Sequence, residues 1–248
     1  MARTGTCIVV GCSSGIGLAI ARRLAQGGRK VAMLARREAE LRAQVHTTND
    51  VLGKELAFAY PHDAADGELV EALFARIEQE LGPVDEVHYV AGVMPDVAID
   101  EFDLAKDRQM VEVNLLGCIA WGNAAARRFL ARRSGCFVGI GSVAGDRGRV
   151  GRPVYNATKA GLDTYLEALR NRLWRHGVQV TTIRQGPTET PMTAHLGLKN
   201  AIAADRAAEL ILRARDARAT IAYVPWKWRL IMLVIRNIPS FVFRRLSI

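Results

Sequence analysis

Short apolar runs rich in β-branched residues alternate along the chain with longer stretches in which apolar residues recur every three or four positions. The short runs are typical of buried parallel strands, and the longer stretches are typical of amphipathic helices. The predicted strands are 7–10, 30–35, 55–60, 86–92, 136–142 and 178–184, and the predicted helices are 18–26, 37–48, 68–81, 108–133, 153–176 and one from about Ala204. Strand–helix alternation at this spacing predicts a parallel sheet with helices on both faces.

The chain contains no linker or low-complexity segment that would divide it into two domains. Its 248 residues, half of them hydrophobic, suit one large α/β domain with a sizeable core. We therefore predict a single domain over residues 1–224 and a basic, aromatic helical extension of that domain over residues 225–248.

A glycine-rich loop, GCSSGIG (11–17), directly follows the first predicted strand and opens the first helix. In that setting the first glycine permits a tight turn, the second a close approach of the backbone to a phosphate, and the third close packing of helix on strand. The serines can cap the helix, whose free N–H groups and dipole face an anion. The spacing G-x-x-x-G-x-G is a variant of the dinucleotide-binding loop. The residues predicted to hold a nucleotide here are Gly11, Ser13, Ser14, Gly15, Ile16 and Gly17.

The second strand ends in LARR (34–37), where the adenosine ribose of a dinucleotide would lie. A carboxylate at this point accepts from the ribose 2′-hydroxyl, whereas an arginine accommodates a 2′-phosphate. Ala35 stands where the acid would be, and Arg36 and Arg37 follow it. The pattern favours NADP(H) and leaves NAD(H) possible; the alternative is that both arginines are ordinary helix-start residues.

Tyr155 and Lys159 in YNATK lie four residues apart in a predicted helix and so share one of its faces. A phenol ionises near pH 10 in isolation, and a neighbouring cation favours its anionic form. The pair is therefore a candidate proton donor with its electrostatic helper. The alternative is that the tyrosine ends an apolar stripe and the lysine is solvated.

The glycine loop, the YNATK pair and the strand order together resemble the short-chain dehydrogenase/reductase family over essentially the whole chain. The resemblance implies a doubly wound Rossmann fold with a seven-stranded parallel sheet. The family's T-G-x-x-x-G-I-G loop matches except that Val10 replaces the threonine. Its N-N-A-G segment matches in the last two residues only, with Tyr89 and Val90 in place of the asparagines, and in its P-G-x-x-x-T segment Gln185 replaces the proline. The further cofactor-binding residues that the resemblance implies are Asp63, Ala91, Gly92, Tyr155, Lys159, Gly186, Thr188 and Thr190.

Four residues match the family's active-site positions in order: Asn114, Ser142, Tyr155 and Lys159. The resemblance implies that Tyr155 donates a proton to the substrate oxygen while Ser142 hydrogen-bonds the same oxygen. Lys159 is implied to stabilise the tyrosinate and bind the nicotinamide ribose, and Asn114 to hold a water that relays protons to Lys159. The implied activity is the interconversion of a ketone or aldehyde and an alcohol.

A short segment of about residues 187–204 is expected to form a lid over the substrate. Met192, with Leu196 and Leu198, makes this lid apolar, and a lipophilic substrate contacting Ser142, Tyr155 and Met192 is expected. His195 in the same segment is interpreted as an ordinary loop residue.

The C-terminal segment 223–248 interleaves tryptophan and phenylalanine with lysine and arginine around the apolar run 230–235. Six apolar residues cannot cross a bilayer, which needs about 20. The segment therefore forms either a helix lying in a membrane interface or a helix packed on the substrate pocket or on another subunit.

Charge and cysteine content narrow the remaining possibilities. The formal charge of +9 is accompanied by no helix-turn-helix, zinc-finger or RNA-binding pattern, so no nucleic-acid partner is expected. The four cysteines lack metal-like spacing and no signal peptide precedes the first strand, so we expect no metal and a reducing cytoplasm, with a peripheral place at the inner membrane face as an option.

A homo-oligomer, dimer or tetramer, is expected to pair through the fourth and fifth helices, where small residues allow close packing. These residues are Gly117, Ala120, Gly122, Ala124, Ala125 and Ala126.

The function that these features predict is that of an NADP(H)-dependent oxidoreductase acting on a carbonyl or alcohol group. A protein of another class would be a nucleotide-binding or membrane-peripheral scaffold that keeps the fold but lacks turnover. The intact set of Asn114, Ser142, Tyr155 and Lys159 favours the enzyme.

Overall fold

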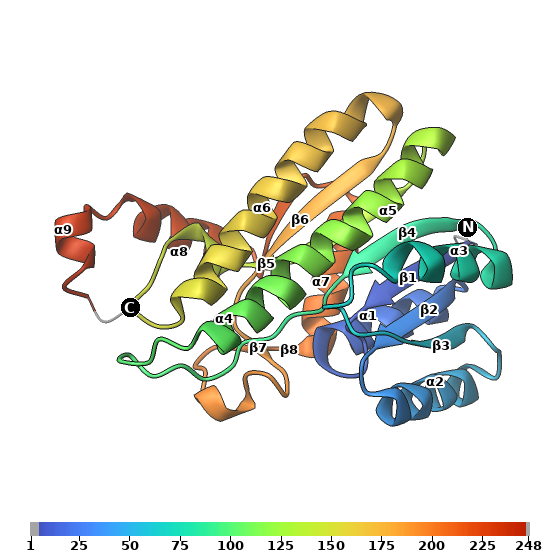
Figure 1. Cartoon of the computed structure of the whole chain (residues 1–248), viewed down its shortest axis with the longest axis horizontal. Coiled ribbons are helices and arrows are strands. Elements are labelled where there is room, and N and C mark those ends of the chain that lie inside the picture. The colour runs from blue at the N-terminus through green and yellow to red at the C-terminus, as the bar shows by residue number, and fades with distance from the viewer. Residues whose placement is uncertain (1–4, 247–248) are drawn as a thin grey trace.

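The computed structural model describes residues 5–246, and seven parallel strands form the central sheet of this part of the chain (Figure 1). The order β3-β2-β1-β4-β5-β6-β9 places β1 beside β4, where the direction of strand addition reverses. The strands are β1 (Thr6–Val10), β2 (Lys30–Ala35), β3 (Ala57–Pro61), β4 (Val84–Tyr89), β5 (Cys136–Ser142), β6 (Gln179–Gln185) and β9 (Ile221–Val224). The predicted doubly wound α/β fold with a seven-stranded parallel sheet is confirmed.

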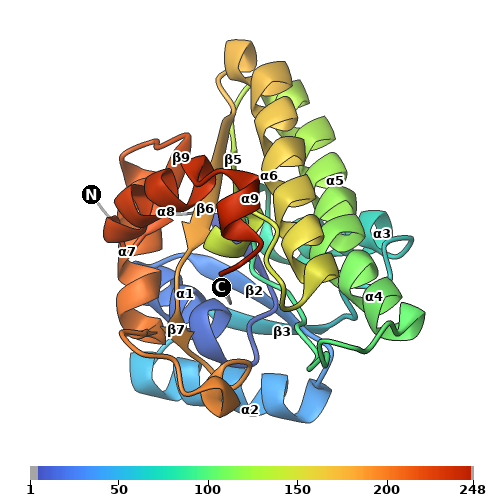
Figure 2. The same cartoon turned by 90° about the vertical axis from the view of Figure 1, so that its left-hand side faces the viewer.

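Helices cover both faces of the sheet, so the central strand β1 is buried at every position rather than at alternate positions (Figures 1 and 2). On one face Ile20 of α1 and Ile211 of α7 pack in one core, and on the other Phe74 of α3, Trp121 of α5 and Leu162 of α6 pack in a second. The helices are α1 (Gly15–Gln26), α2 (Glu38–Leu52), α3 (Val70–Leu81), α4 (Leu104–Val111), α5 (Gly117–Arg132), α6 (Pro153–Leu173), α7 (Ala204–Asp216), α8 (Lys227–Asn237) and α9 (Ser240–Phe243).

The single helix predicted over 108–133 is two helices, α4 and α5, joined by the π-helical turn Glu112–Leu116. A single wider turn of five residues is short compared with the window over which periodicity is read, so the apolar pattern did not reveal it. Its carbonyl at Val113 accepts a hydrogen bond from the hydroxyl of Tyr89, the residue that replaces an asparagine of the family pattern. The turn is thereby tied to the end of β4.

Four of the small residues of α5, namely Gly117, Gly122, Ala124 and Ala125, are buried, whereas Ala120 and Ala126 are partly exposed. A Cβ added to Gly122 would lie 2.3 Å from the hydroxyl of Tyr165 in α6, and one added to Gly117 would lie 2.3 Å from the Ala64 carbonyl oxygen. Ala124 is also fully buried. These buried residues therefore let α5 approach its own neighbours closely, and the pairing of subunits through this region stays a prediction.

A small strand pair and two C-terminal helices are additions to the main sheet and its covering helices. The strands β7 (Thr188–Glu189) and β8 (Ile202–Ala203) form a small parallel pair within the predicted lid, and a 3-10 turn, Ala194–Leu196, lies between them. At the other side α8 and α9 extend from one end of the molecule (Figure 1). Residues 1–4 of the predicted domain and 247–248 of its predicted extension lie outside the described residues. Within residues 5–246 no helix has the length and apolar character needed to span a membrane.

Candidate active site

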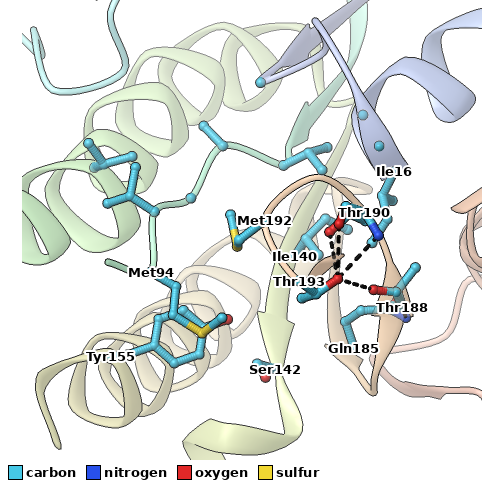
Figure 3. Close-up of a pocket in the computed structure, with 18 of the residues that line it drawn as sticks. Ile16, Met94, Ile140, Ser142, Tyr155, Gln185, Thr188, Thr190, Met192 and Thr193 are labelled. Carbon is cyan, nitrogen blue, oxygen red and sulfur yellow. Dashed lines mark hydrogen bonds between the residues drawn. The ribbon is translucent and has the colours of Figure 1, made fainter. Parts of the chain in front are cut away.

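A cavity of about 570 Å³ opens at the carboxyl ends of the strands, where the loops after β1, β2, β4, β5 and β6 converge. Every residue predicted to bind the cofactor lines it, as do Ser142 and Met192. Figure 3 draws Tyr155, Ser142 and Met94, which come from different elements and line the same cavity. Asn114 is the exception among the predicted site residues, since it does not line the cavity.

The glycine loop between β1 and α1 has room only for glycine at two positions. A Cβ on Gly17 would lie 2.0 Å from the Gly11 carbonyl oxygen. Gly11 has φ +87°, and a Cβ there would lie 2.5 Å from the Cα of Ala91 in the loop after β4. The first glycine therefore permits both the turn and the close approach of two loops. The N-terminus of α1 faces the cavity, because Ser13, Ser14 and Gly15 all line it.

Arg36 and Arg37 form a cationic corner of the cavity. The Nη2 of Arg37 donates to the Oγ of Ser13 at 3.1 Å, and the Nη1 of Arg36 lies 3.7 Å from a carboxylate oxygen of Asp63. Both side chains are more than half exposed and so remain open to a ligand. Guanidinium groups beside a glycine loop suit a phosphate on the ribose of a dinucleotide.

Ser142 and Lys159 are held by main-chain groups. The Oγ of Ser142 accepts from the Ala144 N–H at 3.1 Å, which leaves its own proton to donate. The Nζ of Lys159 donates to the Ile140 carbonyl oxygen at 3.0 Å and lies 5.8 Å from the ring centroid of Tyr155. An ammonium has three donors, so two remain for the tyrosine and a ligand.

Asn114, in the π-helical turn, lies behind the cavity wall. Its Oδ1 accepts from the Val93 N–H at 2.7 Å, and its Nδ2 donates to the Val93 carbonyl oxygen at 2.9 Å. Its side chain is fully buried. A Cβ on the adjacent Gly92 would lie 3.4 Å from Asn114 Oδ1 and 3.6 Å from Lys159 Nζ. Asn114 thus positions the loop beside Lys159; its role in holding a relay water stays a prediction.

Gln185, which replaces the proline of the family pattern, ties the end of β6 to its surroundings through its amide. Its Nε2 donates to the Thr188 Oγ1 at 2.6 Å and to the Val224 carbonyl oxygen at 3.2 Å. The buried side chain of Gln185 therefore holds this turn by hydrogen bonds. A proline at the same position would instead restrict the backbone through its fixed φ.

Comparisons with known proteins agree with this geometry. Residues 5–201 match the family model described as short chain dehydrogenase. The chain belongs to the short-chain dehydrogenase family. It is 32% identical over 190 residues to a 3-oxoacyl-(acyl-carrier-protein) reductase of Mus musculus, a match that covers 77% of this chain and 78% of the mouse protein.

Two solved structures resemble the fold of this short-chain dehydrogenase. A short-chain dehydrogenase from Sphingobium yanoikuyae in complex with NADPH has a TM-score of 0.83 and 22% identity, covering 95% of this chain and 97% of that chain. A variant of actinorhodin polyketide ketoreductase with NADPH has a TM-score of 0.80 and 28% identity, covering 90% of this chain and 96% of that chain.

The segment predicted as a lid in this short-chain dehydrogenase is held by threonines. The Oγ1 of Thr193 donates to the Thr188 carbonyl oxygen at 2.6 Å and accepts from the Thr190 N–H at 3.1 Å (Figure 3). His195 lies outside the cavity lining, with its Nε2 3.0 Å from a carboxylate oxygen of Asp96, as expected of an ordinary loop residue. Movement of the segment as a lid stays a prediction.

Several lining residues of this short-chain dehydrogenase were not found from its sequence. Met94 follows β4, and Arg149 and Arg152 precede α6. Arg152 pairs with Asp96 at 2.8 Å. The Nε of Arg149 has no hydrogen-bond partner among the described residues, and burial lowers the pKa of this guanidinium. These residues lie in irregular loops, so no period or motif marks them.

A charged network supports the loop that follows Ser142. Arg184 of β6 contacts Asp146 at 3.0 Å and Asp163 of α6 at 2.7 Å, and its Nη1 donates to the hydroxyl of Tyr223 at 2.6 Å. Burial raises the pKa of Asp163 to about 6, although Arg184 opposes this effect. The network joins β6, β9 and α6 beneath the active-site loop of this short-chain dehydrogenase.

Proposed function

We propose that this chain is an NADP(H)-dependent oxidoreductase that interconverts a lipophilic ketone or aldehyde and the corresponding alcohol. The observation that carries the proposal is that Tyr155, Ser142 and Lys159 line the same cavity as the glycine loop and the cationic corner. A proton donor and a dinucleotide site in one cavity suit hydride transfer.

The cavity fits the proposed cofactor in two respects. The close contacts of Gly11 and Gly17 bring backbone to where a diphosphate would lie, at the N-terminus of α1. Arg36 and Arg37 supply two cations where a 2′-phosphate would lie, and no carboxylate replaces Ala35 at the end of β2. The NADPH bound by the ketoreductase of similar fold supports this assignment.

The reaction requires the residues of this chain to place and protonate the carbonyl group. A bound nicotinamide supplies or accepts the hydride at the carbonyl carbon. In the reductive direction the Tyr155 hydroxyl donates a proton to the oxygen that becomes the alcohol. Ser142, whose Oγ already accepts from Ala144, donates a hydrogen bond to the same oxygen. Lys159, buried beside the tyrosine ring, favours the tyrosinate that remains.

Apolar residues in the lining of the cavity support the proposal of a lipophilic substrate. Met94 and Val93 from the loop after β4 line the cavity, together with Met192, Leu196 and Leu198 from the lid segment. Methionines adapt to irregular apolar ligands because their side chains are flexible and polarisable.

Cofactor oxidation against a ketone panel tests the proposal. We expect the chain to oxidise NADPH with apolar ketones at a kcat/KM roughly tenfold or more above that with NADH, because loss of a charge-assisted phosphate contact costs over 1.4 kcal/mol.

Arg36→Ala combined with Arg37→Ala should raise the KM for NADPH roughly tenfold and leave that for NADH nearly unchanged. Arg42→Ala, in the exposed pair with Glu38 outside the cavity, is the matched control. An equal preference for both cofactors, or no turnover of any ketone, would contradict the proposal.

We further propose that the chain forms a homo-oligomer through the predicted fourth and fifth helices, which correspond to α4 with α5 and to α6. Phe102 just before α4, Leu104 at its start, and Leu116 before α5 are large apolar residues that are more than half exposed. Sedimentation velocity at micromolar concentration should show a dimer or tetramer, and Phe102→Gln combined with Leu104→Gln should lower its association constant roughly tenfold or more. A parent protein that sediments as a monomer would contradict this proposal.

A further inference from the structure

The helix α8 presents apolar residues on two opposite sides. On its inner side Met232 is fully buried and Trp228 packs on the chain. On its outer side four apolar residues at positions i, i+4, i+7 and i+8 form a continuous stripe. Their exposed fractions are 71% for Trp226, 55% for Leu230, 61% for Leu233 and 65% for Val234. The exposed Phe241 and Val242 of α9 follow it in the chain. Packing on the rest of the chain explains the apolar residues on the inner side of α8. The apolar residues of the outer stripe have no partner among the described residues.

Positive charge borders this stripe. After Asp216 the sequence contains no further aspartate or glutamate, whereas it contains six lysine or arginine residues. Lys227, Arg229 and Arg236 belong to α8, and Arg244 and Arg245 follow α9. All five are exposed. Tryptophan and aliphatic residues flanked by cations on a helix too short to span a bilayer are the composition of an interfacial helix.

The segment is firmly attached to the wall of the cavity. A Cβ on Gly186, which lines the cavity, would lie 2.4 Å from the indole of Trp228. The Nη1 of Arg147 donates to the carbonyl oxygens of Ile235 and Ile238 at 2.6 Å each, and its guanidinium lies 3.8 Å from the ring centroid of Phe243.

A second contact joins the cavity wall to α8. The Nη2 of Arg149, which lines the cavity, lies 3.6 Å from the sulfur of Met232. The orientation of α8 and α9 is therefore coupled to the orientation of the cavity. Figure 2 shows both helices on the side of the molecule that faces the viewer.

The positive charge beside the outer stripe of α8 indicates which partner binds there. In a symmetric contact between two copies the same patch meets itself, so the cations of one copy would face those of the other. An anionic lipid surface instead offers opposite charge to every cation and hydrocarbon to the stripe.

We propose that residues 226–246 dock this protein on an anionic phospholipid bilayer, with the outer stripe of α8 and the apolar residues of α9 in the interface. Docking holds the cavity at the lipid surface, where an apolar substrate is concentrated. The docking itself requires no catalysis; its use for substrate capture rests on the proposed function.

Vesicle flotation of the full chain tests the proposal. The parent should bind vesicles of phosphatidylglycerol and phosphatidylcholine at least tenfold more tightly than vesicles of phosphatidylcholine alone, and the difference should shrink as salt is raised. Leu230→Gln combined with Leu233→Gln should weaken binding to the anionic vesicles at least tenfold. Ile99→Gln, at an exposed apolar residue outside this segment, is the matched control and should bind as the parent does.

Two further measurements separate the alternatives. Circular dichroism and turnover of a water-soluble ketone should be unchanged in the Leu230/Leu233 variant, which shows that it folds. Vesicle binding is measured without substrate, so an inactive parent that still binds would overturn the proposed function and leave the docking intact. Parent-like binding by the double variant, absence of binding by the parent, or conversion of an oligomer to a monomer by the two substitutions would overturn the docking proposal.

Discussion

Tyr155→Phe is expected to lower kcat for ketone reduction by roughly 10² to 10⁴, the usual contribution of a positioned proton donor. The phenylalanine ring keeps the packing against Lys159, whose Nζ lies 5.8 Å from the ring centroid, and removes only the hydroxyl. The NADPH dissociation constant should therefore stay within about threefold of the parent value, since the glycine loop and the arginines are unchanged. Stopped-flow absorbance of NADPH and fluorescence titration measure the two quantities separately.

Tyr165→Phe is the matched control for this experiment. Tyr165 lies on the same helix, α6, but donates to the Ile119 carbonyl oxygen at 3.3 Å and does not line the cavity. Its loss should leave kcat within about twofold. If Tyr155→Phe reduced ketones as fast as the parent, the proton would have to come from another group.

Glu86→Gln is expected to lower the free energy of unfolding by about 3 to 5 kcal/mol, the usual effect of removing one partner from a buried ion pair. Glu86 of β4 is buried, and its carboxylate accepts from Arg215 of α7 at 2.6 Å, from Arg29 at 3.4 Å and contacts His88. The neutral amide would remove the buried counter-charge of two guanidinium groups and leave each with only a half-exposed aspartate, Asp85 beside Arg29 and Asp216 beside Arg215. Urea unfolding measures the difference, and Glu38→Gln, in the exposed pair with Arg42, should cost less than about 1 kcal/mol.

The same residue predicts a response to acid. Burial alone raises the pKa of Glu86, but His88 and Arg215 outweigh burial and hold this pKa at about 2, below the ordinary value of 4.5. Because the pKa is lower in the folded state, the stabilisation is present in full above about pH 4.5 and is lost as the pH falls towards 2. The loss amounts to roughly 3 kcal/mol. The unfolding free energy of the parent should fall over this range more steeply than that of Glu86→Gln; parallel curves would contradict the assignment.

Six of the seven strands of the sheet, and the glycine-loop residues that line the cavity, could be predicted from the sequence because the signals that mark them are local. A buried strand is a short apolar run, a phosphate loop needs glycine at set positions, and Tyr155 and Lys159 share a helix face through their spacing. Departures from the family pattern were visible too, but their consequences were not. The hydrogen bonds of Gln185 and Tyr89 depend on partners in other elements.

The π-helical turn at Asn114 and the use of the small residues in α5 could not be predicted in the same way. Both segments have the apolar spacing of an ordinary α-helix. The residues that pack against them from other elements determine the wider turn and the close contacts. Gly122 faces the hydroxyl of Tyr165, 43 positions along the chain, so nothing near it in sequence distinguishes an internal contact from a subunit contact.

The sequence by itself indicated six of the seven strands of the sheet and most of the helices between them, the family, and the chemistry of the residues that meet at the strand ends, since each depends on residue type and short-range spacing. Only the tertiary structure decided which of these residues face the cavity, that Asn114 lies behind its wall, that Arg29 and Arg215 meet Glu86, and that α8 buries one apolar side and exposes the other. These outcomes depend on long-range packing, which joins residues far apart in the chain and leaves no periodic trace in the sequence.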